Sequence, residues 1–306
     1  MKHVQQKLAI IFLSLFISTN VHAWGSKRPS TPTTPTVPST PSNPTTPTTP
    51  TTPPPITEGA YVDQIKALAA SSSCASYSWK NRSRAPAAYI KGMALNYARS
   101  YCRIKTSLDA PTGAALLLKA KAGDAAKDAV AHYATNFSSL SMNNAVAGYG
   151  PLRSTYTLGI GLGMRESSGK YCEGRDMSAS NTSAETAEAG MFQTSYNSMS
   201  ASPELSKLYA EYKANPGKCL LDVYSAGISC GSTSNAGSGE GLTYQKLNKS
   251  CPAFAAEYAM MMLRVRRNHY GPINRKEAEV IPACKTMLEN VEAIIESNAY
   301  ACDDLI

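Results

Sequence analysis

Apolar residues recur every three or four positions through most of the chain after residue 58, which is the spacing of one helix face. The pattern predicts helices over 61–71, from Pro86 through Ala98, and over 114–134, 158–165, 203–214, 252–268 and 275–297. Proline suits the first turn of a helix, so Pro86 is expected to open its helix, and Pro282 is expected to interrupt the last helix near its start.

Stretches rich in Gly, Ser and Asn separate these segments at 139–150, 177–183 and 229–241, and they predict loops. No long alternation of apolar and polar residues occurs, so we expect no sheet beyond a small hairpin near 170–197. The predicted fold class is therefore mainly α. Residues 58–306 form one domain, close to the upper size for a single core.

The first residues follow a different pattern. Lys2 and Lys7 flank the start of an apolar run over 8–17, and Val21-His22-Ala23 ends in a small-x-small sequence, which together predict a secretory signal peptide over 1–23. The run is about half of the ~20 residues that a spanning helix needs, so a membrane anchor is the weaker interpretation. We expect an exported protein, periplasmic or secreted, with no membrane span after processing.

Proline occupies every third position from Pro29 to Pro53, and Thr and Ser fill most of the gaps. Polyproline II has three residues per turn, so residues 24–57 predict an extended linker with its prolines along one edge. We expect a passive tether. A spacer that reaches through a layer and a ligand for a proline-binding domain are the alternatives.

All eight cysteines lie between Cys74 and Cys302. In an exported chain they predict up to four disulfides, and the spacing alone does not reveal the pairing. Zinc would need closely spaced Cys and His ligands, whereas these cysteines are far apart and only His132 and His269 remain after processing. We therefore expect no metal and no cofactor.

The net charge of the chain is +8, and it becomes +6 once residues 1–23 are removed with their two lysines. A basic surface favours an anionic partner. The stretch from Glu166 to Glu188 is the exception, because it holds five acidic and two basic residues, a local balance of −3. Just before it, glycines at 159, 161 and 163 resemble a nucleotide-binding loop, but the third comes one residue early and no strand precedes it.

Clustered carboxyl groups suit glycoside hydrolysis, in which one carboxyl protonates the leaving oxygen and a second activates water or stabilises the positive sugar. Glu166 follows an apolar helical stretch, so we expect it at a helix end facing the core, where burial would raise its pKa. The other acids lie in polar, loop-like sequence and are expected to stay ionised. On charge alone, a solvated acidic loop is the alternative.

Two motifs carry a resemblance to a known family. Arg165-Glu166-Ser167-Ser168-Gly169, followed by Ala189-Gly190-Met191-Phe192-Gln193, resembles the motifs of goose-type lysozymes and soluble lytic transglycosylases. The likeness extends to a tyrosine-rich helix ending at Tyr270 and is weak before Leu158. It implies a lysozyme-like, disulfide-linked catalytic domain over 58–306 and a peptidoglycan-cleaving activity with Glu166 as the general acid. The expected substrate-binding residues are Glu188, Gly190, Met191, Gln193, Tyr196, Tyr258, His269 and Tyr270.

The chain departs from the family in two respects. Met191-Phe192-Gln193 replaces the family's Leu-Met-Gln order, and residues 194–197 include no acid where goose-type enzymes tend to carry an aspartate. We expect the second carboxylate to be Glu185, with Asp176 and then Glu188 as alternatives. If none reaches the cleft, a lytic transglycosylase, in which the sugar's own 6-hydroxyl attacks, is the alternative. A glycan-binding protein without activity is the rival from another class.

Charge also bears on the substrate. Peptidoglycan carries carboxylates, so a basic outer surface favours association with it, whereas an acidic cleft would suit a glycan with free amines, such as N-deacetylated peptidoglycan. Arg264, Arg266 and Arg267 could contact the wall or form a solvated basic face. Nothing in the sequence indicates nucleic-acid binding. We expect a monomer.

Overall fold

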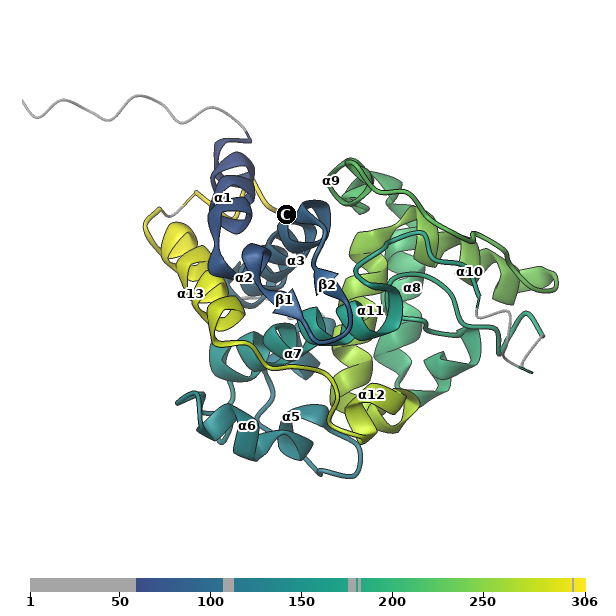
Figure 1. Cartoon of the computed structure of the whole chain (residues 1–306), viewed down its shortest axis with the longest axis horizontal. Coiled ribbons are helices and arrows are strands. Elements are labelled where there is room, and N and C mark those ends of the chain that lie inside the picture. Colours follow the sequence, from purple (N-terminus) through teal and green to yellow (C-terminus); the bar gives the residue numbers. More distant parts are fainter. Residues whose placement is uncertain (1–58, 107–112, 176–179, 181–182, 299) are drawn as a thin grey trace, which may run out of the picture. The chain divides into compact units, whose positions relative to one another are not determined.

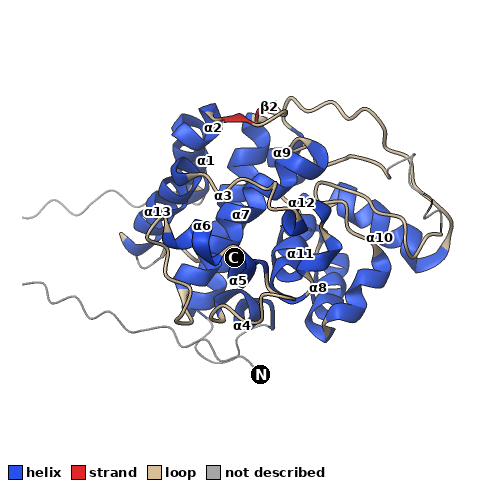
Figure 2. Cartoon of the chain, turned by 60° about the horizontal axis from the view of Figure 1, so that its bottom comes forward, coloured by secondary structure: helices blue, strands red, loops and turns tan. Residues whose placement is uncertain are grey.

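A computed structural model describes residues 59–106, 113–175, 180, 183–298 and 300–306 (Figure 1). The predicted signal peptide and linker lie outside the described residues. The described part of the chain is mainly helical, as predicted, with one short two-stranded sheet (Figure 2). No helix within it is long and apolar enough to span a bilayer.

The helices in chain order are α1 Ala60–Ser71, α2 Ser73–Ser76, α3 Ala87–Thr106, α4 Gly113–Lys119, α5 Ala129–His132, α6 Ala134–Ser138, α7 Tyr149–Ser167, α8 Pro203–Ala214, α9 Leu221–Ser225, α10 Gly239–Ser250, α11 Pro252–Val265, α12 Gly271–Asn274 and α13 Pro282–Glu296. Three short 3₁₀ helices are η1 Tyr196–Ala201, η2 Pro216–Lys218 and η3 Arg267–His269. The strands are β1 Ser78–Trp79 and β2 Ser83–Arg84, which pair antiparallel.

Helices α3 and α7 form the centre of the molecule, and both bury most of their length. On one side α1 and α13 pack against α3, so the two ends of the described chain lie together (Figure 1). On the other side α11 packs against α7 and carries α8 and α10. The turn at 189–194, which follows α7 in the chain, contacts the end of α7 through Ser167 and α10 through Asn248.

Four disulfides pair all eight cysteines: Cys74–Cys284, Cys102–Cys302, Cys172–Cys230 and Cys219–Cys251. The first two join the early helices to the end of the chain. Asp304 adds to this closure, because its carboxylate accepts the main-chain N–H groups of Gly59 and Tyr61 at 2.6 and 3.0 Å, at the start of α1. The first N–H groups of a helix have no acceptor within the helix. Here the Asp304 side chain, near the end of the chain, provides that acceptor.

The predicted helix over 114–134 is wrong, because the chain breaks into α4, α5 and α6. The guanidinium of Arg264 donates hydrogen bonds to the carbonyl oxygens of Leu117, Leu118, Ala120 and Lys121. In a continuous helix these oxygens would accept main-chain N–H groups instead. Asp128 then restarts the chain as a helix cap, accepting the N–H of Val130 at 2.8 Å. A distant arginine thus outweighs the alanine-rich composition.

Two further expectations need correction. Pro282 does not interrupt a helix that starts at 275, because it occupies the first turn of α13, where its missing N–H costs nothing. The small hairpin lies at 78–84 instead of near 170–197, where the described residues hold a single bridge between Ala189 and Thr194. Helices α2, α9, α10 and α12 were not predicted.

Segment 277–281, between α12 and α13, lies directly on α7. A Cβ added at Gly161 would come within 2.2 Å of the Glu279 carbonyl oxygen, so only glycine permits this approach. The glycines that resembled a nucleotide loop in the sequence therefore allow close packing of α7. This contact brings the segment after α12 close to the end of α7, where Glu166 lies.

Candidate active site

Glu166 lies in the last turn of α7, as predicted for a residue at a helix end. The helix stops because Ser168 and Gly169 adopt positive φ angles of 56° and 74°. Their N–H groups return to the carbonyls of Met164 and Gly163, each at 3.1 Å, which is a standard left-handed helix end. The Glu166 side chain is half-buried, with no hydrogen bond or ion pair to its carboxyl from the described residues.

The pKa of Glu166 is raised to about 7. Burial is the largest cause and the nearby charge of Glu188 is the second, whereas Arg82, Arg275 and Arg165 act in the opposite direction. A carboxyl with this pKa carries a proton much of the time near neutral pH. It therefore has the property that a general acid requires.

The residue after Glu166 connects the two sequence motifs. The Ser167 hydroxyl donates to the Met191 carbonyl at 2.8 Å, so the end of α7 is fixed to the turn at 189–194. The side chains of Met191 and Phe192 are fully buried. The Glu-Ser pair and the Gly-Met-Phe-Gln sequence are thus in direct contact in the structure.

The turn itself depends on Gly190 and Gln193. Gly190 has a φ of 77°, and its N–H donates to the Glu173 carbonyl at 2.8 Å. The Gln193 amide donates to the carbonyls of Gly174 and Gly190 at 3.2 and 2.9 Å. These contacts use the side chain of Gln193 to hold the turn against segment 173–174, which limits what it can offer a substrate in this conformation.

His269 connects the turn to the second carboxylate. Its Nε2 lies 3.2 Å from the Gln193 carbonyl oxygen and 3.8 Å from Glu188 Oε1. Burial lowers the pKa of His269, so the ring is neutral near pH 7. A neutral ring with its proton on Nε2 can donate to Gln193 and leave the negative charge of Glu188 in place.

Tyr270 lies next to the two carboxyl groups. Its ring is 1% exposed, and the pKa of its hydroxyl is raised by burial and then by the charges of Glu166, Tyr258 and Glu188. The hydroxyl has no hydrogen-bond partner among the described residues. A buried hydroxyl without a partner beside a candidate general acid is available to the acid or to a bound ligand after a small movement.

The other predicted tyrosines belong to an aromatic cluster behind the turn. Tyr196 is half-buried, and its ring lies 6.3 Å from that of Tyr209 and 6.1 Å from that of Tyr244. Tyr258 is fully buried, and its hydroxyl shares a 2.7 Å hydrogen bond with Ser198. Tyr258 was predicted to contact the substrate, but its side chain is fully buried in this conformation. It packs behind the turn and supports it.

The structure separates the three candidates for the second carboxylate. Glu188 acts electrostatically on Glu166, which was the last choice from the sequence. Glu185, the first choice, is exposed, and its main-chain oxygen accepts the Asn197 N–H at 2.9 Å. Asp176 lies outside the described residues. Among the described candidates, the geometry favours Glu188.

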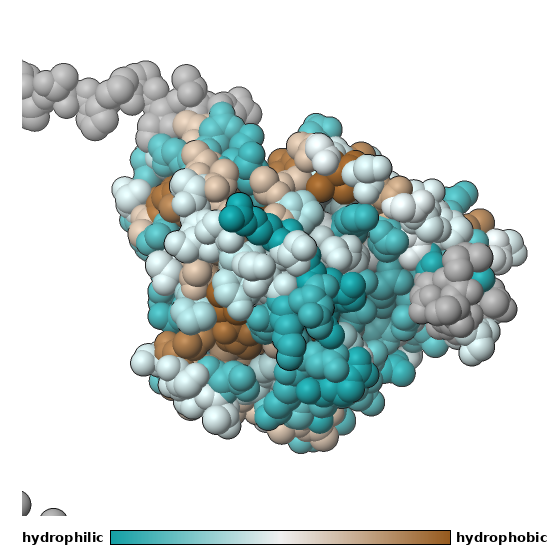
Figure 3. Space-filling view, in the orientation of Figure 1, coloured by the Kyte–Doolittle hydropathy of each residue, from teal (hydrophilic) through white to brown (hydrophobic). Residues whose placement is uncertain are grey.

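Sequence reasoning missed the arginines around Glu166. Arg82 comes from the turn between β1 and β2 and donates to the Arg165 carbonyl at 2.8 Å, and Arg275 follows α12 and pairs with Glu277 at 2.8 Å. Figure 3 shows hydrophilic residues gathered over this hairpin and α12. These positions are 84 and 109 residues from Glu166, and no local sequence pattern connects them to it.

Comparison of the chain with protein-family models, with curated proteins and with solved structures gave no match. The geometry of the site and the likeness of the two motifs are therefore the grounds for a functional proposal.

Proposed function

We propose that this protein is a secreted peptidoglycan-cleaving glycosidase, a muramidase, with Glu166 as its general acid. The observation that carries the proposal is the half-buried Glu166 carboxyl at the end of α7, whose pKa is raised to about 7 next to a second carboxylate. Cleavage of a glycosidic bond needs such a pair, one protonated and one ionised. The motif resemblance to goose-type lysozymes and lytic transglycosylases independently selects the same residue.

Glu188 is the ionised partner in this proposal. Its side chain is 35% exposed, so water reaches its carboxylate. Its carboxylate would stabilise the positive charge that develops on the sugar, or activate the attacking water. His269 would position Glu188 against the turn, and the Tyr270 hydroxyl would bind the Glu166 carboxyl or the leaving oxygen.

Export is part of the proposal. Four disulfides indicate an oxidising compartment, which agrees with the signal-peptide pattern of residues 1–23. The wall glycan is reached in such a compartment. We also propose a preference for N-deacetylated glycan, because the Glu188 carboxylate beside the acid can pair with a free ammonium on the sugar.

The decisive experiment compares the full protein with Glu166→Gln in lysis of purified peptidoglycan. We expect the variant to lose about a thousandfold or more of the rate while circular dichroism stays unchanged, because an amide cannot protonate the leaving oxygen. Glu240→Gln is the matched control, since Glu240 is an exposed glutamate on α10 paired with Lys213. Retained lysis in Glu166→Gln would refute the assignment and favour a glycan-binding role.

Mass spectrometry of the digested wall then decides the reaction type. Reducing ends support hydrolysis, and products lighter by one water support the transglycosylase alternative. Side-by-side digestion of acetylated and deacetylated wall tests the substrate preference. If Glu188→Gln leaves the ratio of the two rates unchanged, Glu188 does not set that preference.

A further inference from the structure

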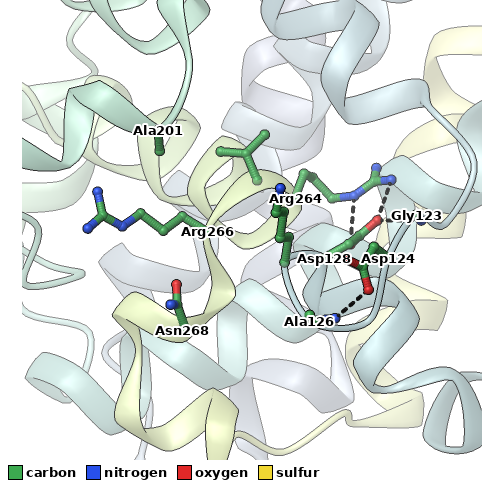
Figure 4. Close-up of a pocket in the computed structure, with 10 residues that line it drawn as sticks. Gly123, Asp124, Ala126, Asp128, Ala201, Arg264, Arg266 and Asn268 are labelled. Carbon is green, nitrogen blue, oxygen red and sulfur yellow. Dashed lines mark hydrogen bonds and ion pairs between the residues drawn. The ribbon is translucent and has the colours of Figure 1, made fainter.

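A pocket with a volume of 550 Å³ lies between the C-terminal end of α11 and the loop at 123–128 (Figure 4). Its lining comes from three parts of the chain, since Ala201 at the end of η1 completes it. The volume is within the range of small-molecule sites, and the lining is rich in charged and polar groups. Arg264 and Arg266, which could contact the wall according to the sequence, line the pocket, whereas the expected substrate-binding residues of the two motifs do not.

One wall of the pocket is rigid and its charges are already paired. Arg264 and Asp128 form an ion pair at 3.1 Å, with side chains only 3% and 4% exposed. Arg264 also binds the carbonyl oxygens after α4, and Asp128 accepts the N–H groups of Gly123 and Val130. These two residues shape the loop and are not available to a ligand.

The ionic groups that remain for a ligand are Arg266, Lys127 and Asp124. Arg266 reaches away from the Arg264–Asp128 pair, and its guanidinium donates a 3.3 Å hydrogen bond to the Ser200 hydroxyl. Lys127 is exposed and forms no ion pair within the described residues. Asp124 is also exposed, and its carboxylate accepts the nearby main-chain N–H of Ala126 at 2.9 Å. The pocket thus offers two cations and one anion.

The pocket lies beside the candidate active site. Asn268, in its lining, directly precedes His269, which contacts Glu188 and Gln193. The positive charge of Arg266 acts on both His269 and Tyr258. The loop is tied to this region as well, because the Arg267 N–H donates to the Lys127 carbonyl at 2.8 Å. The pocket therefore adjoins the part of the candidate site that His269 and Tyr258 form.

We propose that this pocket binds the peptide branch of the glycan, and this inference rests on the proposed function. A wall peptide that contains a diamino acid carries free carboxylates and a free ammonium close together. Arg266 and Lys127 would pair with the carboxylates, and Asp124 would pair with the ammonium. A sugar chain without its peptides lacks this close grouping of several carboxylates and an ammonium on a flexible branch, so the pocket would make the protein prefer strands that carry peptides.

The test measures binding instead of cleavage, in the Glu166→Gln background. The probes are a disaccharide tetrapeptide that contains a diamino acid, the same disaccharide without peptide, and the tetrapeptide form with its free amine acetylated. By titration calorimetry we expect the complete probe to bind at least tenfold more tightly than the bare disaccharide. Lys127→Ala/Arg266→Gln should remove this difference, and Asp124→Asn should remove the difference between the amine and its acetylated form.

The matched control is Lys207→Ala/Lys213→Ala, which removes two exposed positive charges from α8, outside the pocket. It should bind the complete probe like the parent. Lys127→Ala alone changes an exposed loop side chain, so it keeps the test valid if the double variant is unstable. Equal affinity for the complete probe and the bare disaccharide, or no loss in the Lys127 and Arg266 variants relative to the control, would overturn the inference. Peptide-dependent binding by a protein whose unmutated form does not cleave wall would instead refute the proposed function alone.

Discussion

The two carboxyl groups at the site differ because their surroundings differ. Glu166 is fixed in the last turn of α7, and burial raises its pKa to about 7. Glu188 belongs to a loop and keeps 35% of its side chain exposed. Glu185, three residues earlier in the same loop, is exposed, and Glu188 is the acidic residue named among the main causes of the raised Glu166 pKa. The order of preference drawn from the sequence therefore did not identify the second carboxylate, because two acids three residues apart in one loop differ in burial and surroundings that the sequence does not show.

The raised pKa of Glu166 predicts a stability difference that depends on pH. The folded protein holds the Glu166 proton up to about pH 7, whereas the unfolded chain releases it near its ordinary value of 4.5. The protonated Glu166 therefore contributes to the unfolding free energy in full below pH 4.5, and this contribution is lost as the pH rises through 7. It amounts to at most roughly 3 kcal/mol. Relative to the parent, Glu166→Gln should gain about 1 to 3 kcal/mol of unfolding free energy between pH 4 and pH 8, measured in urea.

Glu240→Gln serves as the control, because Glu240 is exposed and its pKa is lowered by Lys213 and Tyr209. Between the same two pH values, the unfolding free energy of this variant should not increase relative to that of the parent. A Glu166→Gln curve parallel to that of the parent would show that Glu166 titrates near its ordinary pKa, and the main support for the general acid would be lost.

The interaction between the two carboxyls predicts a shift in the pH profile of activity. The charge of Glu188 raises the pKa of Glu166, so Glu188→Gln should lower it and move the alkaline limb of the activity profile to lower pH by about half a unit. The measurement is the initial rate of wall lysis between pH 5 and 9. If the variant is too slow, a ¹³C NMR titration of Glu166 gives the same answer. An alkaline limb that stays in place or moves upward would contradict the coupling.

At the scale of elements, the sequence was most informative where helix periodicity and packing agree. The predicted bounds of α8 match the structure, and α1 and the end of α7 lie where expected. The failure at 114–134 has a physical cause, because Arg264 donates to carbonyls at and just after the end of α4 from 144 to 147 residues away. The hairpin at 78–84 has strands of two residues, too short to show an alternating pattern. Local patterns predicted the helices, whereas long-range polar contacts determined where they stop.

The turn at 189–194 makes a testable prediction of its own. Gly190 has a φ of 77°, and an added Cβ would lie 3.1 Å from Asn248. Gly190→Ala should therefore cost about 1 to 3 kcal/mol of unfolding free energy and lower the lysis rate, because the strained turn would no longer hold its position against Ser167. Urea denaturation and the lysis assay measure the two effects.

Gly217→Ala is the matched control for this turn. Gly217 lies in η2, and an added Cβ would meet nothing within 4 Å. It should change stability by less than about 0.5 kcal/mol and leave lysis unchanged. If Gly190→Ala behaves like this control, the backbone of the turn tolerates a side chain and does not depend on glycine.

At the scale of the whole molecule, the charge around the site depends on residues that are distant in the sequence. The stretch 166–188 has a balance of −3 in the sequence, which indicated an acidic cleft. In the structure Arg82, Arg275 and Arg165 act on Glu166 from outside that stretch and lower its pKa. The site thus contains both carboxylate and guanidinium groups. This mixture could accept a substrate that carries both amines and carboxylates, which agrees with a wall glycan and its peptides.

The closure of the molecule by disulfides gives the last prediction. Cys102–Cys302 encloses a loop with a sequence separation of 200, and Cys219–Cys251 one of 32, and all four cysteines are buried. In Cys102→Ala/Cys302→Ala the Cys74–Cys284 bond stays closed, so the loop that this variant opens runs only over 74–102 and 284–302, which are 28 and 18 residues of chain. This is close to the separation of 32 in Cys219–Cys251. Because the entropy of loop closure grows slowly with loop length, Cys102→Ala/Cys302→Ala and Cys219→Ala/Cys251→Ala should lose unfolding free energy within about 0.5 kcal/mol of each other. Urea denaturation of both oxidised variants measures the difference. Similar burial makes the packing losses comparable, and Asp304 and Arg99 still hold the tail in the first variant. A loss that is larger by about 1.5 kcal/mol in the first variant would contradict this argument, because it would mean that the Cys74–Cys284 bond does not shorten the loop in the unfolded chain.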